Sequence, residues 1–287
     1  ILNLPLHSRC SASMRSKFQI QAVLIMVMTV SLLYPARAQT SYNPYELDLN
    51  KELAYFTTGV VLNITGLLAR TQKAPFTVEQ ALTDTNTDHI PAFDLSAVWQ
   101  SNQTYLVASD YALYASLALP LLSLVDGNVN DNAVTAILLY VETMSISSGV
   151  YNMTSGIISR RRPLTYNTQD FTIEERTASN VKESFFSGHA TISASASFCG
   201  AKIFNDFHPN SKLKPVVWTV AAALPAFISF ARYKAGKHFP TDVITGYVVG
   251  ASIGYLIPEL HRIDKKDRLS IAPMIGEGDG VYISYQF

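Results

Sequence analysis

The stretch Arg232-Tyr-Lys-Ala-Gly-Lys-His238-Phe-Pro-Thr-Asp242 combines a fixed cation, an imidazole and a carboxylate within eleven residues. Pro240 suits the first turn of a helix, because its missing N–H has no intrahelical partner to lose there. The carboxylate of Asp242 would then lie close enough to orient the ring of His238 and make one imidazole nitrogen basic. Arg232 adds a planar fork suited to an oxyanion such as phosphate. The alternative is a solvated loop that leads into a helix cap.

Two upstream stretches favour a phosphate site. Ser187-Gly188-His189 precedes a small-residue segment that predicts a helix over 190–204, and backbone N–H groups at a helix start bind phosphate well. Arg160-Arg-Arg-Pro163 follows a long segment, 132–159, that also predicts a helix. Each stretch alone also fits an ordinary loop or a solvated helix end.

Together, and in this order, the three stretches resemble the signature of the type 2 phosphatidic acid phosphatase family. Its superfamily also includes bacterial acid phosphatases and vanadium haloperoxidases. The resemblance covers roughly residues 105–260. It implies that His238 is the nucleophile that takes the phosphoryl group, that Asp242 orients and charges its ring, and that His189 protonates the leaving oxygen. It assigns the binding of the nonbridging oxygens to Arg162, Ser187, the Gly188 amide and Arg232.

Two positions depart from the family pattern: Phe186 stands where a proline is usual before Ser-Gly-His, a minor change, and Ser155 is the informative departure. The first motif usually begins with a lysine seven residues before its arginine, and Ser155 stands there instead. One phosphate-binding cation is therefore missing where the pattern has it. The sequence leaves its replacement open among Arg160, Arg161, Lys182, Lys234 and Lys237.

The residue types fit phosphoryl transfer, which needs charge stabilisation on the equatorial oxygens by arginine forks and helix-end amides. A histidine nucleophile gives a phosphohistidine, and a second histidine acts as acid and then as base. No Asp, Glu and His cluster with metal-ligand spacing is visible, so we expect a metal-independent phosphoric monoester hydrolase without a cofactor. The alternatives are a vanadate-dependent haloperoxidase and a non-catalytic phosphate-binding envelope protein.

Composition places the chain between the soluble and membrane classes, with 48% hydrophobic residues, 15% charged residues and a mean hydropathy of +0.15. The formal net charge is zero. Residues 1–38 carry bases and no acid, so the remainder is mildly acidic, which argues against a nucleic-acid partner.

Residues 14–38 have a basic start, an apolar run and an Ala36-Arg-Ala38 end, which predicts a signal peptide preceded by an upstream extension, residues 1–13. An uncleaved anchor helix is the alternative. Cleavage would leave Cys199 as a lone core cysteine. We therefore expect an exported protein of the cell envelope, either in the inner membrane with a periplasmic-facing active site or in the periplasm.

The predicted fold is all-α, a bundle of about six core helices followed by a short C-terminal β-hairpin. The expected organisation is an N-terminal helix and long connection (39–104), a phosphatase core (105–260), and a basic linker with the hairpin (261–287). The repeated Gly246, Gly250 and Gly254 predict a seam along which another helix approaches closely. The expected helices are 52–70, 105–125, 132–159, 190–204, 215–231 and 241–257.

Two membrane arrangements remain open from the sequence. In one, helices 105–126 and 132–159 cross the membrane while helix 52–70 lies flat or packs peripherally. In the other, the whole bundle is exported and compact. Either suits a phosphorylated lipid or a small phosphate ester as substrate, and we expect membrane association.

Overall fold

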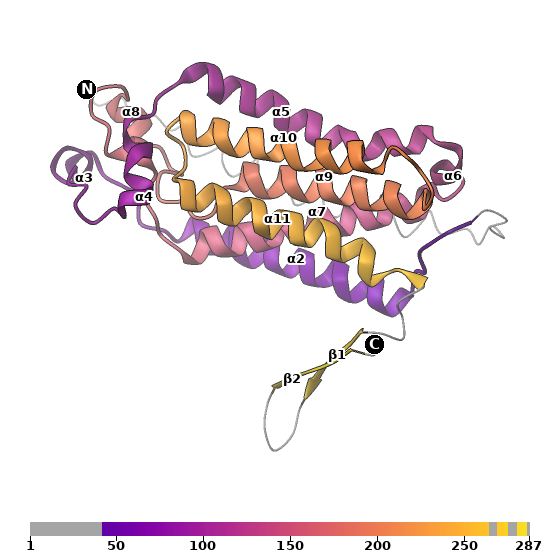
Figure 1. Cartoon of the computed structure of the whole chain (residues 1–287). Coiled ribbons are helices and arrows are strands. Elements are labelled where there is room, and N and C mark those ends of the chain that lie inside the picture. Colours follow the sequence, from indigo (N-terminus) through magenta and orange to yellow (C-terminus); the bar gives the residue numbers. More distant parts are fainter. Residues whose placement is uncertain (1–41, 264–268, 275–279, 286–287) are drawn as a thin grey trace, which may run out of the picture. The chain divides into compact units, whose positions relative to one another are not determined.

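The computed structural model describes residues 42–263, 269–274 and 280–285, and most of these residues are helical. The predicted all-α class is confirmed. The long helices are α2 (Leu49–Thr71), α5 (Gln103–Leu122), α7 (Ala133–Ile157), α9 (Gly188–Phe207), α10 (Lys214–Lys234) and α11 (Pro240–Leu260) (Figure 1). Short helices connect them: α3 (Val78–Thr83), α4 (Ala92–Leu95), α6 (Gly127–Asn130) and α8 (Ile173–Arg176). Three 3-10 turns complete the connections: η1 (Ser96–Trp99), η2 (Ser123–Val125) and η3 (Pro163–Thr165).

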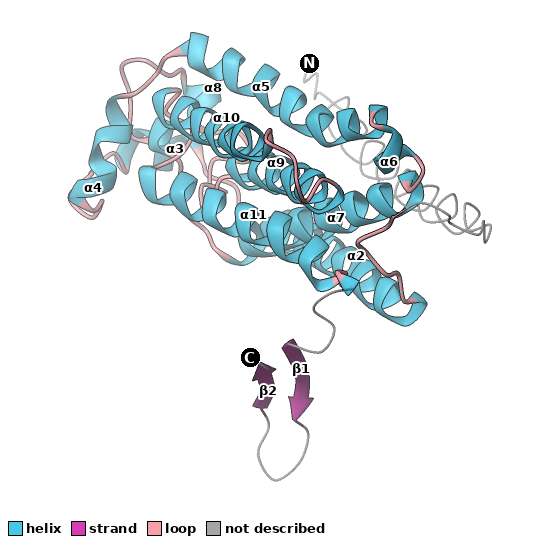
Figure 2. Ribbon diagram, turned by 45° about the vertical axis from the view of Figure 1, so that its right-hand side comes forward, coloured by secondary structure: helices cyan, strands magenta, loops and turns pink. Residues whose placement is uncertain are grey.

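Helix α9 lies at the centre of the bundle, in contact with α5, α7, α10 and α11 (Figure 2). Thirteen of its twenty residues are buried, most of them Ala or Ser, and small side chains let several helices pack closely around it. Helix α2 buries only Gly59 and Gly66, and α5 buries only three residues. The expected number of about six core helices is therefore not confirmed, because α2 and α5 add little to the interior.

The predicted glycine seam on α11 is confirmed, and its partner is α9. A Cβ atom on Gly250 would lie 2.2 Å from the carbonyl oxygen of Thr191, and Gly246 and Gly254 meet the same helix. Only a residue without a side chain permits this approach. The seam therefore fixes the start of α11, and with it Asp242, against the start of α9.

A second seam, not predicted from the sequence, joins α2 to α7. A Cβ atom on Gly66 would lie 2.4 Å from the backbone of Asn152, and Gly59 meets Ser145 in the same way. The contact on α7 moves from Ser145 to Asn152 as the glycine on α2 moves from Gly59 to Gly66. Since both numbers increase in the same direction, α2 runs parallel to α7. Helix 52–70 thus packs along α7 with little burial, so of the two alternatives predicted for it, lying flat and packing peripherally, the structure favours the second.

Five of the described helices are long and apolar enough to cross a membrane: α2, α5 with η2, α7, α10 and α11. Large apolar side chains are exposed along the outer faces of four of them. Examples are Leu53 and Leu68 on α2, Tyr111, Tyr114 and Leu122 on α5, Val216 and Phe227 on α10, and Ile244 and Val248 on α11. These faces are compatible with membrane association.

At the C-terminus, β1 (Leu269–Met274) and β2 (Gly280–Tyr285) pair antiparallel, with Leu269 opposite Tyr285. Residues 275–279 lie outside the described part of the chain, so the complete hairpin stays a prediction. The signal peptide and upstream extension predicted within residues 1–38 also lie outside it, and the domain boundaries stay predictions.

Candidate active site

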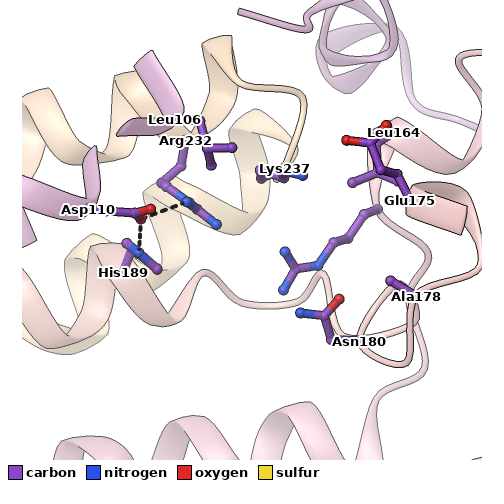
Figure 3. Close-up of a pocket in the computed structure, with 10 residues that line it drawn as sticks. Leu106, Asp110, Leu164, Glu175, Ala178, Asn180, His189, Arg232 and Lys237 are labelled. Atoms are coloured by element: carbon purple, nitrogen blue, oxygen red, sulfur yellow. Dashed lines mark hydrogen bonds and ion pairs between the residues drawn. The ribbon is translucent and has the colours of Figure 1, made fainter. Parts of the chain in front are cut away.

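Four helix ends converge at one end of the bundle. Helix α7 ends just before the arginine triplet, α9 begins at Gly188, α10 ends at Lys234, and α11 begins at Pro240. A cavity of about 370 Å³ opens beside the start of α5 at this end (Figure 3). The residues that line it are Leu106, Asp110, Arg162, Leu164, Glu175, Ala178, Asn180, His189, Arg232 and Lys237. Three predicted site residues, Arg162, His189 and Arg232, therefore share one cavity.

The two arginines are unusually buried for cations. Arg162 is 7% exposed and Arg232 is 5% exposed, and the Nε atom of each is buried without a hydrogen-bond partner among the described residues. Burial lowers the pKa of Arg162 from its usual value. A buried charge with unmet hydrogen-bonding capacity is costly unless it is paired, so this pair of guanidinium groups is suited to an incoming anion.

His189 lies on the cavity wall, at the second residue of α9. Its Nε2 atom is 2.9 Å from Oδ1 of Asp110, and the same oxygen accepts a hydrogen bond from Arg232 at 3.3 Å (Figure 3). Burial, and next the charge of Arg232, lower the pKa of His189 to about 4. Asp110 thus connects the expected acid to an expected phosphate ligand.

Asp110 was not among the predicted site residues. The signal that could have found it is an acidic residue inside an otherwise strongly apolar helix, since ionisable groups in such segments are costly and usually functional. Its chain position, about eighty residues before His189, gave no hint of the contact.

His238 lies in the loop before α11 and is 2% exposed. Its Nδ1 atom is 2.9 Å from the carbonyl oxygen of Ser184, whereas Oδ2 of Asp242 is 3.9 Å away. A carbonyl only accepts, so Nδ1 carries the proton and Nε2 keeps the lone pair. Burial, and next the charges of Arg162 and Arg232, hold the pKa of His238 well below its usual value.

The expected hydrogen bond between Asp242 and His238 is therefore replaced by the bond to Ser184. Asp242 instead accepts hydrogen bonds from the Ser184 hydroxyl at 2.6 Å and from the Phe239 N–H at 2.9 Å, and it pairs with Arg160. Asp242 thereby fixes Ser184, whose carbonyl accepts the hydrogen bond from the His238 ring, and Phe239, which follows His238 in the chain. His238 is not among the residues that line the cavity.

Ser187 and Gly188 form the start of α9. The Ser187 hydroxyl accepts from the Ala190 N–H at 3.5 Å as the helix cap, and the Ser187 N–H donates to the Asp242 carbonyl. Gly188 packs against Tyr151, whose ring a Cβ atom would approach to 2.8 Å. The first backbone N–H groups of a helix have no intrahelical acceptor, as the predicted phosphate role requires. Neither residue lines the cavity.

Ser155, which stands where the family pattern has a lysine, packs inside the helix bundle and does not reach the cavity. Ser155 is fully buried in α7, and its hydroxyl donates to the carbonyl of Asn152. Its own carbonyl accepts from Lys73, which also donates to the carbonyl of Ile158 at 2.7 Å. No charge is supplied to the cavity from this point of α7.

Four of the five candidate replacements are occupied elsewhere. Arg160 pairs with Asp94 and Asp242, Arg161 with Asp84, Lys182 donates to the carbonyl of Ala74, and Lys234 donates to Gln100. Lys237 is the one that lines the cavity. Burial, and next the charges of Arg162 and Arg232, lower its pKa.

Two histidines and two buried arginines thus lie at or next to converging helix ends in a mostly helical protein. Residues 136–265 match the model of the PAP2 superfamily, in agreement with the resemblance of the three motifs. Searches of curated proteins and of solved structures gave no match.

Proposed function

We propose that this protein is a metal-independent phosphatase that hydrolyses a phosphate monoester or pyrophosphate of a lipid through a phosphohistidine. PAP2 membership indicates phosphatase or haloperoxidase-type activity, and thus supports a hydrolase. The observation that carries the proposal is the pair of buried guanidinium groups, Arg162 and Arg232, beside the cavity that His189 lines. Their Nε atoms have no hydrogen-bond partner among the residues that the structure describes.

In the first step, Arg162, Arg232 and Lys237 hold the nonbridging oxygens while Nε2 of His238 attacks phosphorus. The P–N bond forms as the P–O bond to the leaving group breaks, and His189 gives its proton to the leaving oxygen. In the second step, His189 takes a proton from water, whose oxygen attacks phosphorus and releases His238.

The low pKa of His189 in the free protein is consistent with this role. The charges of Arg232 and Arg162 help to lower it, and a bound phosphate dianion would offset both cations. Substrate binding would therefore raise the pKa of His189 and load the acid with its proton. Asp110, which contacts both His189 and Arg232, would keep the ring facing the leaving oxygen.

A lipid substrate is supported by the exposed apolar faces of the long helices. The cavity lies beside the start of α5, whose outer face carries Val107, Tyr111 and Tyr114. A substrate held in a bilayer along this face would present its phosphate at the level of Asp110. We propose that the protein is membrane-bound; it should stay in the pellet after alkaline extraction, and its release would refute this.

The directions of α2 and α7 constrain the orientation that the protein could have in a membrane. Since α2 and α7 run parallel and both end near the site, spanning helices would put the start of α2 and the site on opposite faces of the membrane. If α2 spans the membrane, a periplasmic site requires that α2 begin in the cytoplasm. Cleavage of a signal peptide would instead leave the start of α2 in the periplasm. The exported compact bundle has no such constraint. Labelling of Asp48→Cys in intact cells by an impermeant thiol reagent, together with hydrolysis of an impermeant substrate by the same cells, would favour the exported bundle, because spanning helices cannot place both on the outer side.

The test of the chemistry is p-nitrophenyl phosphate turnover by the wild type, His238→Ala and His189→Ala. His89→Ala is the matched control, because His89 bonds Tyr166 and does not line the cavity. We expect activity to be lost in the first variant, to fall more than about 100-fold in the second, and to persist in the control. Acid-labile phosphate should be trapped on the wild type and absent from His238→Ala. Equal turnover in all four proteins would refute the enzymatic proposal.

The substrate class is tested with phosphatidate, phosphatidylglycerophosphate, isoprenyl pyrophosphate and soluble monoesters. Each is assayed with a chelator and again with magnesium, and hydrolysis that needs magnesium would contradict the metal-independent mechanism. Bromide oxidation with added vanadate and peroxide is the corresponding assay for the haloperoxidase alternative.

A further inference from the structure

Three ionisable side chains from distant parts of the chain meet at the other end of the bundle. Glu52 lies in the first turn of α2, Glu142 lies on α7, and His261 follows the last residue of α11. His261 is nineteen positions after Asp242 along α11, which is about 28 Å at helical rise. This cluster is therefore remote from the proposed active site, and the proposed mechanism does not use it.

The geometry of the cluster fits a single bound cation. Nε2 of His261 is 3.2 Å from Oε1 of Glu52 and 3.4 Å from Oε2 of Glu142, and one ligand atom from each residue lies within 4.8 Å of the others. Ligands at about 2.0–2.2 Å from a tetrahedral metal ion are about 3.4 Å apart. The two nitrogen–oxygen distances match that spacing.

The tautomer of His261 also fits. Its Nδ1 atom is 2.7 Å from the carbonyl oxygen of Ile257, so Nδ1 donates and the lone pair of Nε2 faces the two carboxylates. Metal-bound histidines usually have this second-shell hydrogen bond to a carbonyl. A lone pair that faces two carboxylates is repulsive unless a cation or shared protons lie between them.

Within the described part of the chain, the candidate ligand atoms have no hydrogen-bond partner outside the cluster. His261 is 4% exposed and Glu142 is 2% exposed. Nε2 of His261, Oε2 of Glu142 and both carboxylate oxygens of Glu52 are buried without a hydrogen bond in the described part of the chain. Buried polar atoms without a hydrogen bond are rare in proteins and need an explanation, and a bound metal ion is one such explanation.

Nearby basic residues neutralise other acids. Lys202 pairs with Asp206 at the same end of the bundle and with Glu259 at 2.8 Å, and Arg262 pairs with Asp206 at 3.5 Å. Among the residues that the structure describes, His261 is the only ion-pair partner of Glu52 and Glu142. The two carboxylates therefore share a single imidazole.

We propose that Glu52, Glu142 and His261 bind one divalent transition-metal ion, with zinc as the best match. One imidazole nitrogen and two carboxylate oxygens form a ligand set that zinc accepts, and water completes the coordination. The side chain of Glu52 is 13% exposed, which gives the ion a route from solvent. The ion is structural: it ties the start of α2 to α7 and to the end of α11, and takes no part in hydrolysis.

The test is metal binding by the purified full-length protein. After removal of metals with a chelator, we expect the wild type to take up about one zinc ion per chain and cobalt to give the visible d–d absorption of a low-coordinate site. Zinc at about 100 times its Kd should raise the Tm by about 5–10 °C. Glu142→Gln and His261→Asn should each weaken zinc binding more than about 100-fold, since losing a second-shell partner alone costs 10–100-fold.

His208→Asn is the matched control. His208 also directs Nδ1 to a backbone carbonyl, that of Phe204, but its Nε2 faces only one carboxylate, Asp126 at 3.2 Å. This variant should bind zinc as the wild type does. No zinc uptake by the wild type, or equal uptake by Glu142→Gln, would overturn the proposal and leave shared protons as the explanation of the cluster. Hydrolysis is not the readout, so the result is independent of the proposed phosphatase activity.

Discussion

Replacing Lys237 tests whether this residue supplies the cation that Ser155 fails to provide. Lys237 lines the same cavity as Arg162 and Arg232, and its lowered pKa reflects burial and their charges. The ammonium group of Lys237 is repelled by the charges of Arg162 and Arg232. Its position is explained if a phosphate binds between the three cations. We therefore expect Lys237→Ala to weaken transition-state binding while leaving the fold intact.

The magnitude follows from the kind of contact that is lost. A hydrogen bond to a charged group contributes about 1.5–3 kcal/mol net, and each 1.36 kcal/mol is a factor of ten in rate. The loss of one such contact predicts a fall in kcat/KM of about 10- to 150-fold. Lys237→Arg keeps the charge and should recover part of that loss.

Lys234→Ala is the matched control. Lys234 is three residues earlier, and its ammonium donates to Gln100 at 3.2 Å outside the cavity. Steady-state hydrolysis of p-nitrophenyl phosphate by the three variants gives the comparison, with Tm as the check on folding. A Lys237→Ala enzyme within about twofold of wild type, or an equal loss in Lys234→Ala, would refute the assignment of the missing cation to Lys237.

Three further predictions concern the site and its supports. Asp110→Asn should lower kcat about tenfold or more and move the acidic limb of the pH–rate profile, because it removes the charge beside His189; an unchanged profile would contradict a positioning role. Gly250→Ala should cost about 1–3 kcal/mol and lower the Tm, since its Cβ would meet the Thr191 carbonyl at 2.2 Å, whereas Gly127→Ala, with nothing within 4 Å, should leave the Tm unchanged. The Tm should also fall as pH drops from about 6.5 to 4, because the unfolded chain takes up a proton at His189 that the folded state, with a pKa of about 4, does not; His189→Gln should reduce this fall, and an identical pH dependence of Tm in the variant would contradict it.

The motif residues could be predicted from the sequence because each depends on local geometry. Pro240 and Ser187 mark helix starts, and both α11 and α9 begin where these residues indicate. Regular spacing of Gly246, Gly250 and Gly254 predicted a close helix neighbour, and α9 is that neighbour. These features depend on backbone conformation and helical periodicity, which a short stretch of chain determines.

The contact between Asp242 and His238 shows the limit of that reasoning. Four residues of spacing place the two side chains near each other, but 3.9 Å separates their closest atoms and the Ser184 carbonyl takes the hydrogen bond. The sequence could not give this outcome, because Ser184 approaches from a loop more than fifty residues away.

By itself, the sequence determined the all-α class, and it predicted the three motifs and their resemblance to the PAP2 superfamily, since helix starts, apolar periodicity and motif spacing are local properties of the chain. Only the tertiary structure decided that Asp110 faces His189, that Lys237 alone among the candidate cations lines the cavity, and that Glu52, Glu142 and His261 meet. The physical reason is the same in each case. These contacts join side chains on different helices, and their distances depend on how the helices pack, which in this bundle is set by glycine seams and small residues that allow backbones to approach.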